Sequence, residues 1–429
     1  MTVRLGGLLL AALLAFLLSA FTPLSRAPAV ALIWMAGLLA FAEVDAATRR
    51  LTLILMIAGL LATAGSLLLG AGFDVLAMGG INLPIIALFL GVAFLSLVGP
   101  AVPVAEPSSP RRGGLWRTMA AIHLIGAVIN MSMVAIAGDR LARDGTLARR
   151  EAILLARSYC AAAFWSPFFV AAAVAHTYAP QARALFYLPL GVIGALCAFA
   201  LTAREVARLD PDTPLPEFRP DRSAWQLTLA LLATALLLKA VLPALPMVII
   251  VAAVTPPLAL LLMPRGNPIA GARMLLATTL PATASQVVLF LAAGVFAYGV
   301  SSLIPPALAA LDLLPDAVPL PVYPLATAVI ILAAYAGMHP LISIAALSSV
   351  LLPAGAQHSL LAFSFLSGWA VGTAVAPLSG MNLFLIGRYR LRAREIARWG
   401  PGYALAMLGV VTVLMVIGHG LLEMGLLPR

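Results

Sequence analysis

Two hydrophobic segments of this sequence are each interrupted by a proline, and the two prolines, Pro167 and Pro377, lie 210 residues apart. Proline has no N–H to donate, so in a helix the carbonyls of Ala163 and Thr373, one turn earlier, lack their usual donor. Inside a bilayer such a carbonyl is tolerated only where protein, water or a bound ion satisfies it. The feature therefore predicts a membrane protein with two related halves, each containing one broken spanning helix.

The composition agrees with a membrane protein and excludes a soluble globular one. The chain is 63% hydrophobic and 10% charged, with a mean hydropathy of +1.07. Its formal net charge of +10 could suggest nucleic acid, but 25 of its 26 basic residues are arginines that gather in a few short loops between apolar stretches. No nucleic acid is therefore expected. Cys160 and Cys197 both lie in hydrophobic segments and suggest no disulfide or metal framework.

Apolar stretches of about 17–25 residues are long enough to cross a bilayer as helices. Residues 1–26 resemble a signal peptide in length, but no clear small-residue cleavage site follows, so they are interpreted as a first spanning helix. The sequence predicts eleven spans, at 5–21, 27–43, 51–72, 81–98, 147–178 (interrupted), 184–203, 225–242, 246–263, 276–300, 359–387 (interrupted) and 402–425. Two further apolar stretches, 118–138 and 322–352, are predicted to be re-entrant hairpins.

The placement of charge supports this interpretation of the two hairpins. If the N-terminus is cytoplasmic, 21 basic residues lie inside and only Arg26, Arg183 and Arg429 outside, with Arg157 and Lys239 in spans. That asymmetry follows the positive-inside rule, and a full span at either hairpin would destroy it. The stretch 301–320, which has no Lys or Arg, is expected outside. We therefore expect a multi-pass protein of the inner (plasma) membrane, with its N-terminus in the cytoplasm and its C-terminus outside.

The predicted fold is an all-α polytopic membrane protein with about eleven transmembrane helices and two re-entrant hairpins in an inverted repeat. An extra helix at 1–26 precedes the first repeat, 27–203, and a charged cytoplasmic linker at 204–224 leads to the second, 225–429. Each repeat holds three helices, a hairpin, an interrupted helix and a closing helix. Because five spans per repeat is an odd number, the second repeat is inverted relative to the first.

The hairpin tips and the helix breaks share one register. The turn of the first hairpin falls at Asn130 and Ser132, that of the second at His339 and Pro340 with Ser343 one turn later, and a shift of 210 residues aligns Asn130 with Pro340. Half-helices that begin at a tip present free N–H groups and a positive dipole end, which suit an anion. Freed carbonyls at the breaks suit a small cation. Neighbouring anion and cation sites are what ion-coupled anion uptake requires.

At the second break, the residues Gly372-Thr373-Ala-Val-Ala-Pro377-Leu-Ser379-Gly-Met-Asn382 resemble a Gly-Thr-Pro-Pro-Asn-like break. The stretch 129–132 is similar to a Ser-Asn-Thr-like hairpin tip. Both motifs belong to the ion-transporter superfamily, in particular divalent anion/sodium symporters and the large membrane subunit of TRAP carboxylate transporters. The first break and the second tip depart from those motifs. The resemblance implies a secondary active transporter, with sodium-coupled import of a small organic anion of the carboxylate class by elevator-like alternating access.

The candidate site combines the tips and the breaks. The predicted substrate-binding residues are Asn130, Ser132, Trp165, Ser166, His339, Ser343, Thr373 and Asn382. The predicted sodium ligands are the carbonyls of Ala163 and Thr373, with the side chains of Ser166, Ser379 and Asn382. No acidic residue is expected in the middle of a span, which favours sodium over a proton as the coupling ion. His123 is interpreted as structural, and Arg157, about 15 Å along the helix from Pro167, is left outside the site.

Several alternatives stay open at this point. A proton-coupled anion transporter, with His339 or His123 as proton carrier, an exporter or an anion channel would fit the same pattern. A membrane enzyme or lipid-handling protein is disfavoured because no His-x-x-x-His, paired aspartates, nucleophile elbow or phosphate loop is present. The expected partners are a small anionic solute and the lipid bilayer, with no cofactor other than a coupling sodium ion. Analogy with related folds suggests a homodimer, and the sequence leaves any accessory subunit and the substrate undetermined.

Overall fold

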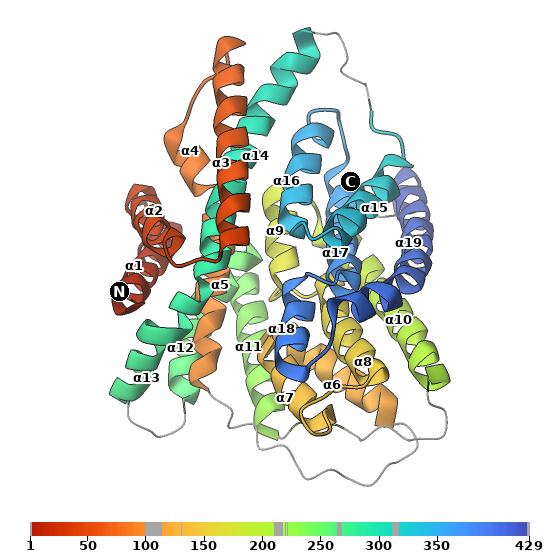
Figure 1. Ribbon diagram of the computed structural model, residues 1–429. Helices are drawn as coiled ribbons and strands as arrows, with labels where there is room; N and C mark the ends of the chain where they lie inside the picture. Colours follow the sequence, from red (N-terminus) through yellow and green to blue (C-terminus); the bar gives the residue numbers. More distant parts are fainter. Residues whose placement is uncertain are drawn as a thin grey trace. The chain divides into compact units, whose positions relative to one another are not determined.

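The computed structural model describes residues 2–98, 114–129, 131–209, 218, 220, 222–263, 268–310 and 317–426 (Figure 1). Within these ranges the chain is built from helices, and the only strand-like feature is an isolated bridge between Arg143 and Thr146. The helices divide between two compact units, each made of segments that are distant in sequence. Unit 1 comprises Met1–Ala101, Ala230–Asp316 and Ala345–Gly355, and unit 2 comprises Val102–Leu229, Ala317–Ile344 and Ala356–Arg429.

Unit 1 is a bundle of apolar helices that pack on one another in sequence-distant pairs. Its helices are α1 (Thr2–Phe21), α2 (Ala27–Phe41), α3 (Ala46–Leu68), α4 (Val75–Gly80), α5 (Leu83–Ala93), η1 (Phe94–Leu97), α12 (Met247–Leu262), α13 (Pro268–Met274), η3 (Leu275–Thr279), η4 (Pro281–Thr283) and α14 (Ala284–Ala310). Helix α3 packs along α14, and α5 packs along α12. Gly59 of α3 lies against the backbone of Val295 and Phe296, so the α3–α14 crossing leaves no room for a side chain there.

Unit 2 contains the helices on both sides of the first predicted tip, the turn of the second predicted tip and both broken helices. Its helices are α6 (Gly114–Ile129), α7 (Met131–Leu141), α8 (Arg149–Cys160), η2 (Ala161–Phe164), α9 (Val170–Tyr178), α10 (Ala184–Leu209), α15 (Val322–Tyr335), α17 (His358–Val375), α18 (Gly380–Tyr389) and α19 (Ala393–Glu423). Helices α11 (Arg222–Val241) and α16 (Pro340–Leu351) begin in unit 2 and end in unit 1. Helix α17 is the centre of unit 2: it packs against α15, α19, α10, α9 and η2, and most of its residues are buried.

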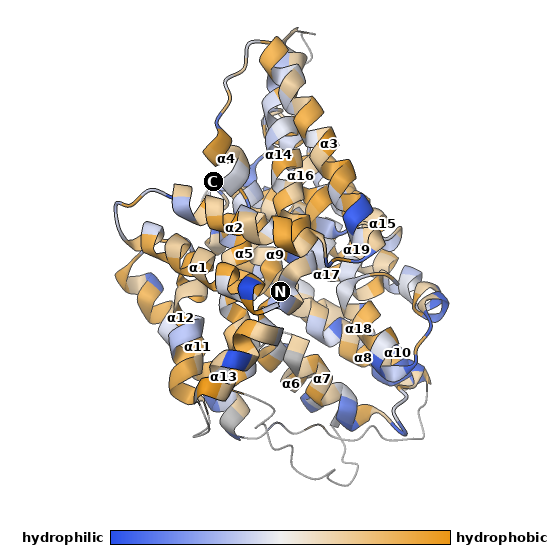
Figure 2. Ribbon diagram, turned by 60° about the vertical axis from the view of Figure 1, so that its left-hand side comes forward, coloured by the Kyte–Doolittle hydropathy of each residue, from blue (hydrophilic) through white to orange (hydrophobic). Residues whose placement is uncertain are grey.

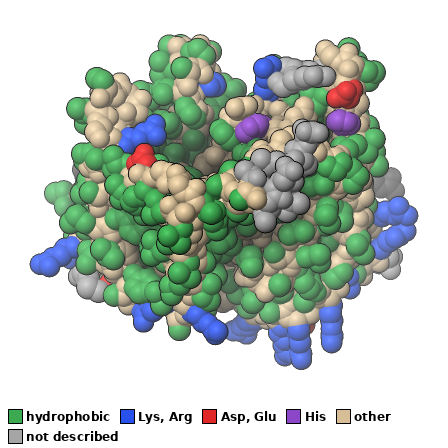
Figure 3. Space-filling model, turned by 90° about the horizontal axis from the view of Figure 1, so that it is seen from above, with side chains coloured by type: hydrophobic (Ala, Val, Ile, Leu, Met, Phe, Trp, Pro, Cys, Tyr) green, Lys and Arg blue, Asp and Glu red, His purple; other side chains and the backbone are tan. Residues whose placement is uncertain are grey.

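The helices agree with an all-α polytopic membrane protein. Eight helical stretches of described residues are long and apolar enough to cross a membrane, and the remaining expected spans correspond to shorter apolar helices or to broken ones. Figure 2 shows that most helices are coloured as hydrophobic along their length. Large apolar side chains such as Leu38, Leu68 and Leu261 are 73%, 89% and 80% exposed. Figure 3 shows a face on which hydrophobic side chains cover most of the surface. Such a surface is stable in lipid and not in water.

Two helices run further than the sequence predicts. Helix α10 continues to Leu209, past the predicted span end at 203 and into the predicted linker, and it carries Glu205 with it. Helix α14 continues to Ala310 through Pro305 and Pro306, although residues 301–320 were expected to form a loop. Both extensions have a physical reason. A charged residue marks where a helix leaves an apolar environment, and a proline removes one hydrogen bond, but neither has to end the helix.

Candidate functional site

The chain leaves helical geometry next to Pro167, between η2 and α9. Helix α8 tightens into the 3-10 turn η2, and the chain then leaves helical geometry at Trp165 before α9 begins. The N–H groups of Trp165 and Ser166 both donate to the carbonyl of Ala162, at 3.2 and 2.8 Å. Pro167 has no N–H for the buried carbonyl of Ala163. The break thus leaves the Ala163 carbonyl without the helical donor that Pro167 lacks, and its role as a cation ligand stays a prediction.

The first break is fastened to helix α6, which leads to the predicted tip of the first hairpin. The Ser166 hydroxyl donates to the carbonyl of Ala127 at 2.7 Å and accepts from the N–H of Phe168 at 3.2 Å. Ser166 is 1% exposed, so both bonds are shielded from solvent. The Ser166 hydroxyl therefore has a donor and an acceptor within the protein, and it holds the break against α6.

His123 of α6 closes a second connection to the same break. Its Nδ1 lies 3.0 Å from the carbonyl of Ser158, and its Nε2 lies 2.9 Å from Nε1 of Trp165. The indole N–H can only donate, so Nε2 must accept, and Nδ1 must carry the proton that reaches the Ser158 carbonyl. These contacts define a neutral tautomer with both ring nitrogens engaged. The predicted substrate-binding residue Trp165 is therefore tied to His123, whose structural interpretation these bonds support.

The second break follows α17 at Ala376, and α18 begins after Ser379. Ser379 caps α18, since its Oγ accepts from the N–H of Asn382 at 3.2 Å. The same hydroxyl donates to the carbonyl of Thr373 at 2.8 Å, which is the carbonyl that Pro377 leaves without a backbone donor. The sequence predicts this carbonyl as a free cation ligand. In the structure it is satisfied by a side chain of the break itself.

Asn382 gathers the remaining carbonyls of the second break. Its Nδ2 lies 3.3 Å from the Thr373 carbonyl oxygen, 3.2 Å from that of Ala374 and 2.9 Å from that of Ala376. The side chain is 1% exposed. Three carbonyl oxygens thus converge on one buried amide nitrogen, which has two hydrogens to share among them. A position surrounded by carbonyl oxygens is electronegative, and it suits either a donor group or a small cation.

The two breaks meet at α17. The 3-10 turn η2 of the first break packs on α17, the helix that the second break follows. The Thr373 hydroxyl donates to the carbonyl of Trp369 at 2.6 Å. Residues predicted from two distant parts of the sequence are therefore brought into one region of unit 2.

The second predicted tip lies against the second break. The turn at 336–339 separates α15 from α16, and a Cβ built at Gly337 would touch Leu378 of the break. The ring of His339 packs edge-on against Trp369 of α17, with centroids 5.3 Å apart. Ser343 is buried, with its hydroxyl 3.6 Å from the sulfur of Met338. His339 thus lies close to the central helix, whereas the described contacts of Ser343 stay within its own hairpin.

Two predicted residues at the first tip cannot be placed in the same way. Asn130 lies outside the described residues. Ser132 lies in the first turn of α7, and its side chain is outside the description as well. Both remain predictions.

Arg157 is a site residue that the sequence analysis left out. Its side chain is 3% exposed, and its guanidinium bonds the carboxylate of Glu205 at 2.6 Å and the carbonyl of Trp399 at 3.1 Å. It also lies over the ring of Tyr403, 4.1 Å from the centroid. The sequence signal was Arg157 itself, since an arginine within a span requires a partner. Glu205 was missed because it was assigned to the linker.

Arg157 also adjoins the second break. A cavity of about 20 Å³ is lined by Arg157 together with Ala374 and Asn382 of the break and Trp399 of α19. That volume is sufficient for one water molecule. Arg157 is therefore far from the first break along the helix, but the fold places it beside the second break.

A further set of contacts joins the first hairpin to α18. Arg388 binds Asp139 in a bidentate ion pair, with Nε–Oδ1 and Nη2–Oδ2 distances of 2.8 and 2.6 Å. The buried Tyr389 donates its hydroxyl toward the carbonyl of Ala135 (3.0 Å) and Oδ1 of Asp139 (2.9 Å). A Cβ at Gly138 would collide with this hydroxyl, so only glycine permits the contact. We call these five residues the α7–α18 latch.

The latch predicts a defined pH dependence. Hydrogen bonding to Arg388 lowers the pKa of Asp139 below its ordinary value of 3.8, so the folded state holds the carboxylate ionised to lower pH than the unfolded state. The pair therefore contributes its stability above pH 3.8 and loses it as the pH falls through the folded pKa. Because both side chains are 48% exposed, we expect Asp139→Asn to cost about 0.5–1 kcal/mol.

Thermal unfolding of wild type and Asp139→Asn from pH 8 downward measures how the contribution of the Asp139–Arg388 pair to stability depends on pH. The difference in Tm should stay constant from about pH 8 to pH 5 and shrink only at lower pH. A difference that already shrinks between about pH 7 and pH 5 would mean that the carboxyl pKa is raised rather than lowered.

Comparisons with known proteins identify a fold and no family. No protein-family model and no curated protein matches the sequence. Among solved structures, the YdaH transporter of Alcanivorax borkumensis, described as having an unusual topology, is similar, with a TM-score of 0.55 and 15% sequence identity. The similarity covers 86% of this chain and 98% of that chain. The chain therefore has the fold of a polytopic membrane transporter.

Proposed function

We propose that the protein is a secondary active transporter that couples a sodium ion to the movement of a small organic anion. The observation that carries the proposal is the second break, where three carbonyl oxygens converge on the buried amide of Asn382. The similarity in fold to a transporter supports the general class. The sodium ion, the anion and the mechanism are parts of the proposal.

The second break offers neutral oxygen ligands of the kind that a dehydrated sodium ion uses. The carbonyls of Thr373, Ala374 and Ala376 are already directed at one point, and the hydroxyl of Ser379 contacts the first of them. Rotation of the Asn382 amide by half a turn would replace its NH₂ group by its oxygen. The residues of the break would then hold the cation, and the charge of the cation would replace the donor that the amide supplies.

A proton route through His123 has less support. Both ring nitrogens of His123 are engaged, and protonation of Nε2 would set two donors, the imidazolium N–H and the Trp165 indole N–H, against each other. No cluster of three or more His, Cys, Asp or Glu side chains that could hold a metal ion occurs among the described residues. The neutral oxygens of the break are therefore the better candidate for the coupling site.

Arg157 supplies the positive charge that favours an anion. Burial of a guanidinium is costly; Glu205 and the Trp399 carbonyl offset part of the cost, and Arg157 also lines the small cavity shared with Asn382. An anion that enters this cavity, after it widens, would be adjacent to both the guanidinium and the bound cation. Mutual attraction of the two ions would then couple their binding.

The division into two compact units supports an elevator-like mechanism. Both breaks, Arg157 and the tip at His339 belong to unit 2, while α1–α5 and α12–α14 belong to unit 1. In such a mechanism the unit that carries the substrate moves against a unit that stays fixed in the membrane. We assign the moving role to unit 2 because it contains the candidate site.

The proposal predicts a sodium-specific effect on the purified protein. A ligand that binds only the folded state raises the free energy of unfolding, by about 2.7 kcal/mol when its concentration is a hundred times Kd, and Tm rises with it. We expect NaCl, and not KCl at equal ionic strength, to raise the Tm of wild type, and we expect Asn382→Ala to abolish the shift. A sodium gradient should also drive uptake of labelled succinate, used as a probe carboxylate, into proteoliposomes.

A matched control is available in unit 1. Asn82 is also a buried amide, 2% exposed, whose Nδ2 donates to the carbonyl of Phe290 at 2.9 Å. Asn82→Ala should lose stability and keep the sodium-specific shift. Equal shifts with sodium and potassium in wild type, or succinate uptake that needs only a pH gradient, would overturn the sodium assignment.

A further inference from the structure

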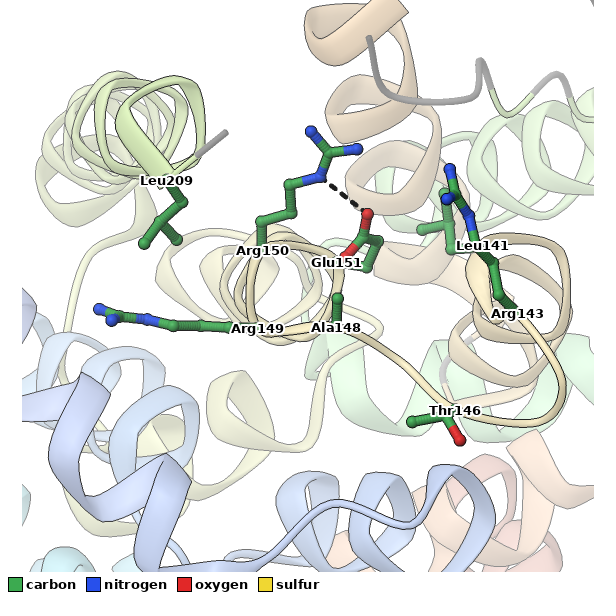
Figure 4. Close-up of a pocket in the computed structure, with 8 residues that line it drawn as sticks. All are labelled: Leu141, Arg143, Thr146, Ala148, Arg149, Arg150, Glu151 and Leu209. Carbon is green, nitrogen blue, oxygen red and sulfur yellow. Dashed lines mark hydrogen bonds and ion pairs between the residues drawn. The ribbon is translucent and has the colours of Figure 1, made fainter. Parts of the chain in front are cut away.

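A second polar cavity lies at the start of α8, separate from the helix breaks. It has a volume of about 600 Å³ and is lined by Leu141, Arg143, Thr146, Ala148, Arg149, Arg150, Glu151 and Leu209. Figure 4 shows the first turn of α8 in the centre, with Arg143 on one side and Arg149 extending to the other. Among the described lining residues are three arginines and one glutamate, which give these side chains a net charge of +2 (three minus one).

The first turn of α8 breaks a local rule of helix stability. The N-terminal end of a helix is already positive and favours acidic side chains, yet α8 begins with Arg149 and Arg150. No side chain caps the N–H groups that follow Ala148. Glu151 opposes this charge within the turn, and Glu205 of α10 contacts Arg149 while also binding Arg157. Places where a sequence violates a local rule tend to be functional, and the shared carboxylate leaves this end of the helix positive and suited to an anion.

The arginines of the cavity differ in how they are engaged. Arg150 binds Glu151 at 2.8 Å, and both side chains are more than nine-tenths buried, so we do not count Arg150 as a ligand-binding group. Arg149 is 45% exposed and reaches Glu205 at 3.2 Å while lying 5.6 Å from the ring centroid of Trp399. Its contact with Glu205 shows that the guanidinium can bind a carboxylate in this place. Arg143 is exposed on the opposite wall.

Glu151 adds a second requirement on the ligand. Its side chain is 8% exposed, and its Oε1 accepts from Arg150. Its Oε2 is buried and has no hydrogen-bond partner among the described residues. A buried carboxylate oxygen without a donor is costly, and a bound donor group removes that cost. The wall of the cavity thus combines positive groups for an anion with one acceptor for a neighbouring hydroxyl or ammonium group.

We propose that this cavity binds a phosphate group that carries an adjacent hydroxyl or ammonium group. Arg143, Arg149 and the positive N-terminal end of α8 hold the phosphate, and Glu151 accepts the hydrogen bond from the adjacent group. The proposal does not depend on the transported solute. Two sources share this chemistry: the headgroup of a membrane phospholipid, and a soluble phosphate ester such as glycerol 3-phosphate.

Calorimetric titration of the purified full chain with glycerol 3-phosphate tests the soluble source. Thermal unfolding in nanodiscs with and without phosphatidylglycerol, on a phosphatidylcholine background, tests the lipid source. In whichever arm shows an effect, Arg149→Gln and Arg143→Gln should each weaken it roughly fivefold to tenfold, as expected for a half-exposed charge-assisted hydrogen bond. The effect should decrease with added salt because the site is open to solvent.

Arg394→Gln is the matched control, since Arg394 is an exposed arginine in the first turn of α19 that does not line the cavity. It should leave binding unchanged. Glu151→Gln should reduce the preference for glycerol 3-phosphate over inorganic phosphate. The amide oxygen keeps the bond from Arg150, and the NH₂ group that then replaces Oε2 cannot accept from the hydroxyl. An effect in neither arm, or equal weakening by Arg394→Gln and Arg149→Gln, would overturn the proposal. Loss of sodium-driven transport with intact Arg149-dependent binding would affect only the proposed function.

Discussion

Replacement of Arg157 by methionine is expected to lower the free energy of unfolding by about 3 kcal/mol, which is the lower end of the cost of breaking a buried ion pair. The substitution removes the bond to Glu205, the bond to the Trp399 carbonyl and the contact with the Tyr403 ring together. The cost stays at the lower end because Glu205 is 28% exposed and keeps its contact with Arg149. Chemical unfolding in detergent measures the difference.

A double variant separates the charge from the packing. In Arg157→Met combined with Glu205→Met, no unpaired charge remains, and the loss should fall to a fraction of that of the single variant. Arg204→Met is the control, since Arg204 is an exposed neighbour on α10 and should change little. If the double variant is as unstable as Arg157→Met alone, the ion pair does not explain the role of Arg157.

Replacement of Asn382 by aspartate is expected to have an equally large effect, and one that sodium reverses. The change is isosteric, but it places a carboxylate oxygen where the NH₂ group now faces the carbonyls of Thr373, Ala374 and Ala376. An uncompensated buried charge costs about 3–5 kcal/mol. A cation in the same place would be held by four oxygens, so sodium should raise the Tm of Asn382→Asp by more than that of wild type.

Asn382→Leu provides the comparison for this experiment. It also removes the donor, but it offers no oxygen to a cation, so its Tm should fall without any recovery in sodium. Most of the loss of stability comes from the Ala374 carbonyl, which is left without a donor, because the carbonyls of Thr373 and Ala376 keep Ser379 as a partner. Recovery of Asn382→Asp in potassium as well as in sodium would mean that the break is electronegative without being selective.

The breaks were predictable because their cause is local. A proline at 167 and one at 377 each remove a single N–H, and the chain departs from helical geometry within a few residues of each. The second tip was predictable for a similar reason, since Gly337 has a φ of +96°, a conformation that glycine adopts without strain. The fold class followed from the apolar spans, which the exposed leucines of the structure confirm as a lipid-facing surface.

The partners of the site residues were not predictable, because they come from distant parts of the chain. The motif indicated Asn382 as a polar group, and only the folded break shows that it donates to three carbonyls. Nothing in the sequence around His123 distinguishes a core histidine from a ligand-binding one. Its role depends on Trp165 and Ser158, which are at least 35 residues away. Arg157 was a signal that a carboxylate should be near, but Glu205, 48 residues away, was assigned to the linker and missed.

The α7–α18 latch has a consequence for biosynthesis. Asp139 and Arg388 are 249 residues apart, so the ribosome makes the first hairpin long before the residues that fasten it. At about 5–20 residues per second, the interval is roughly 12–50 seconds. During that time Asp139 and the carbonyl of Ala135 have neither Arg388 nor Tyr389 to satisfy them. Helix α7 must therefore keep its place without the latch until α18 has been made.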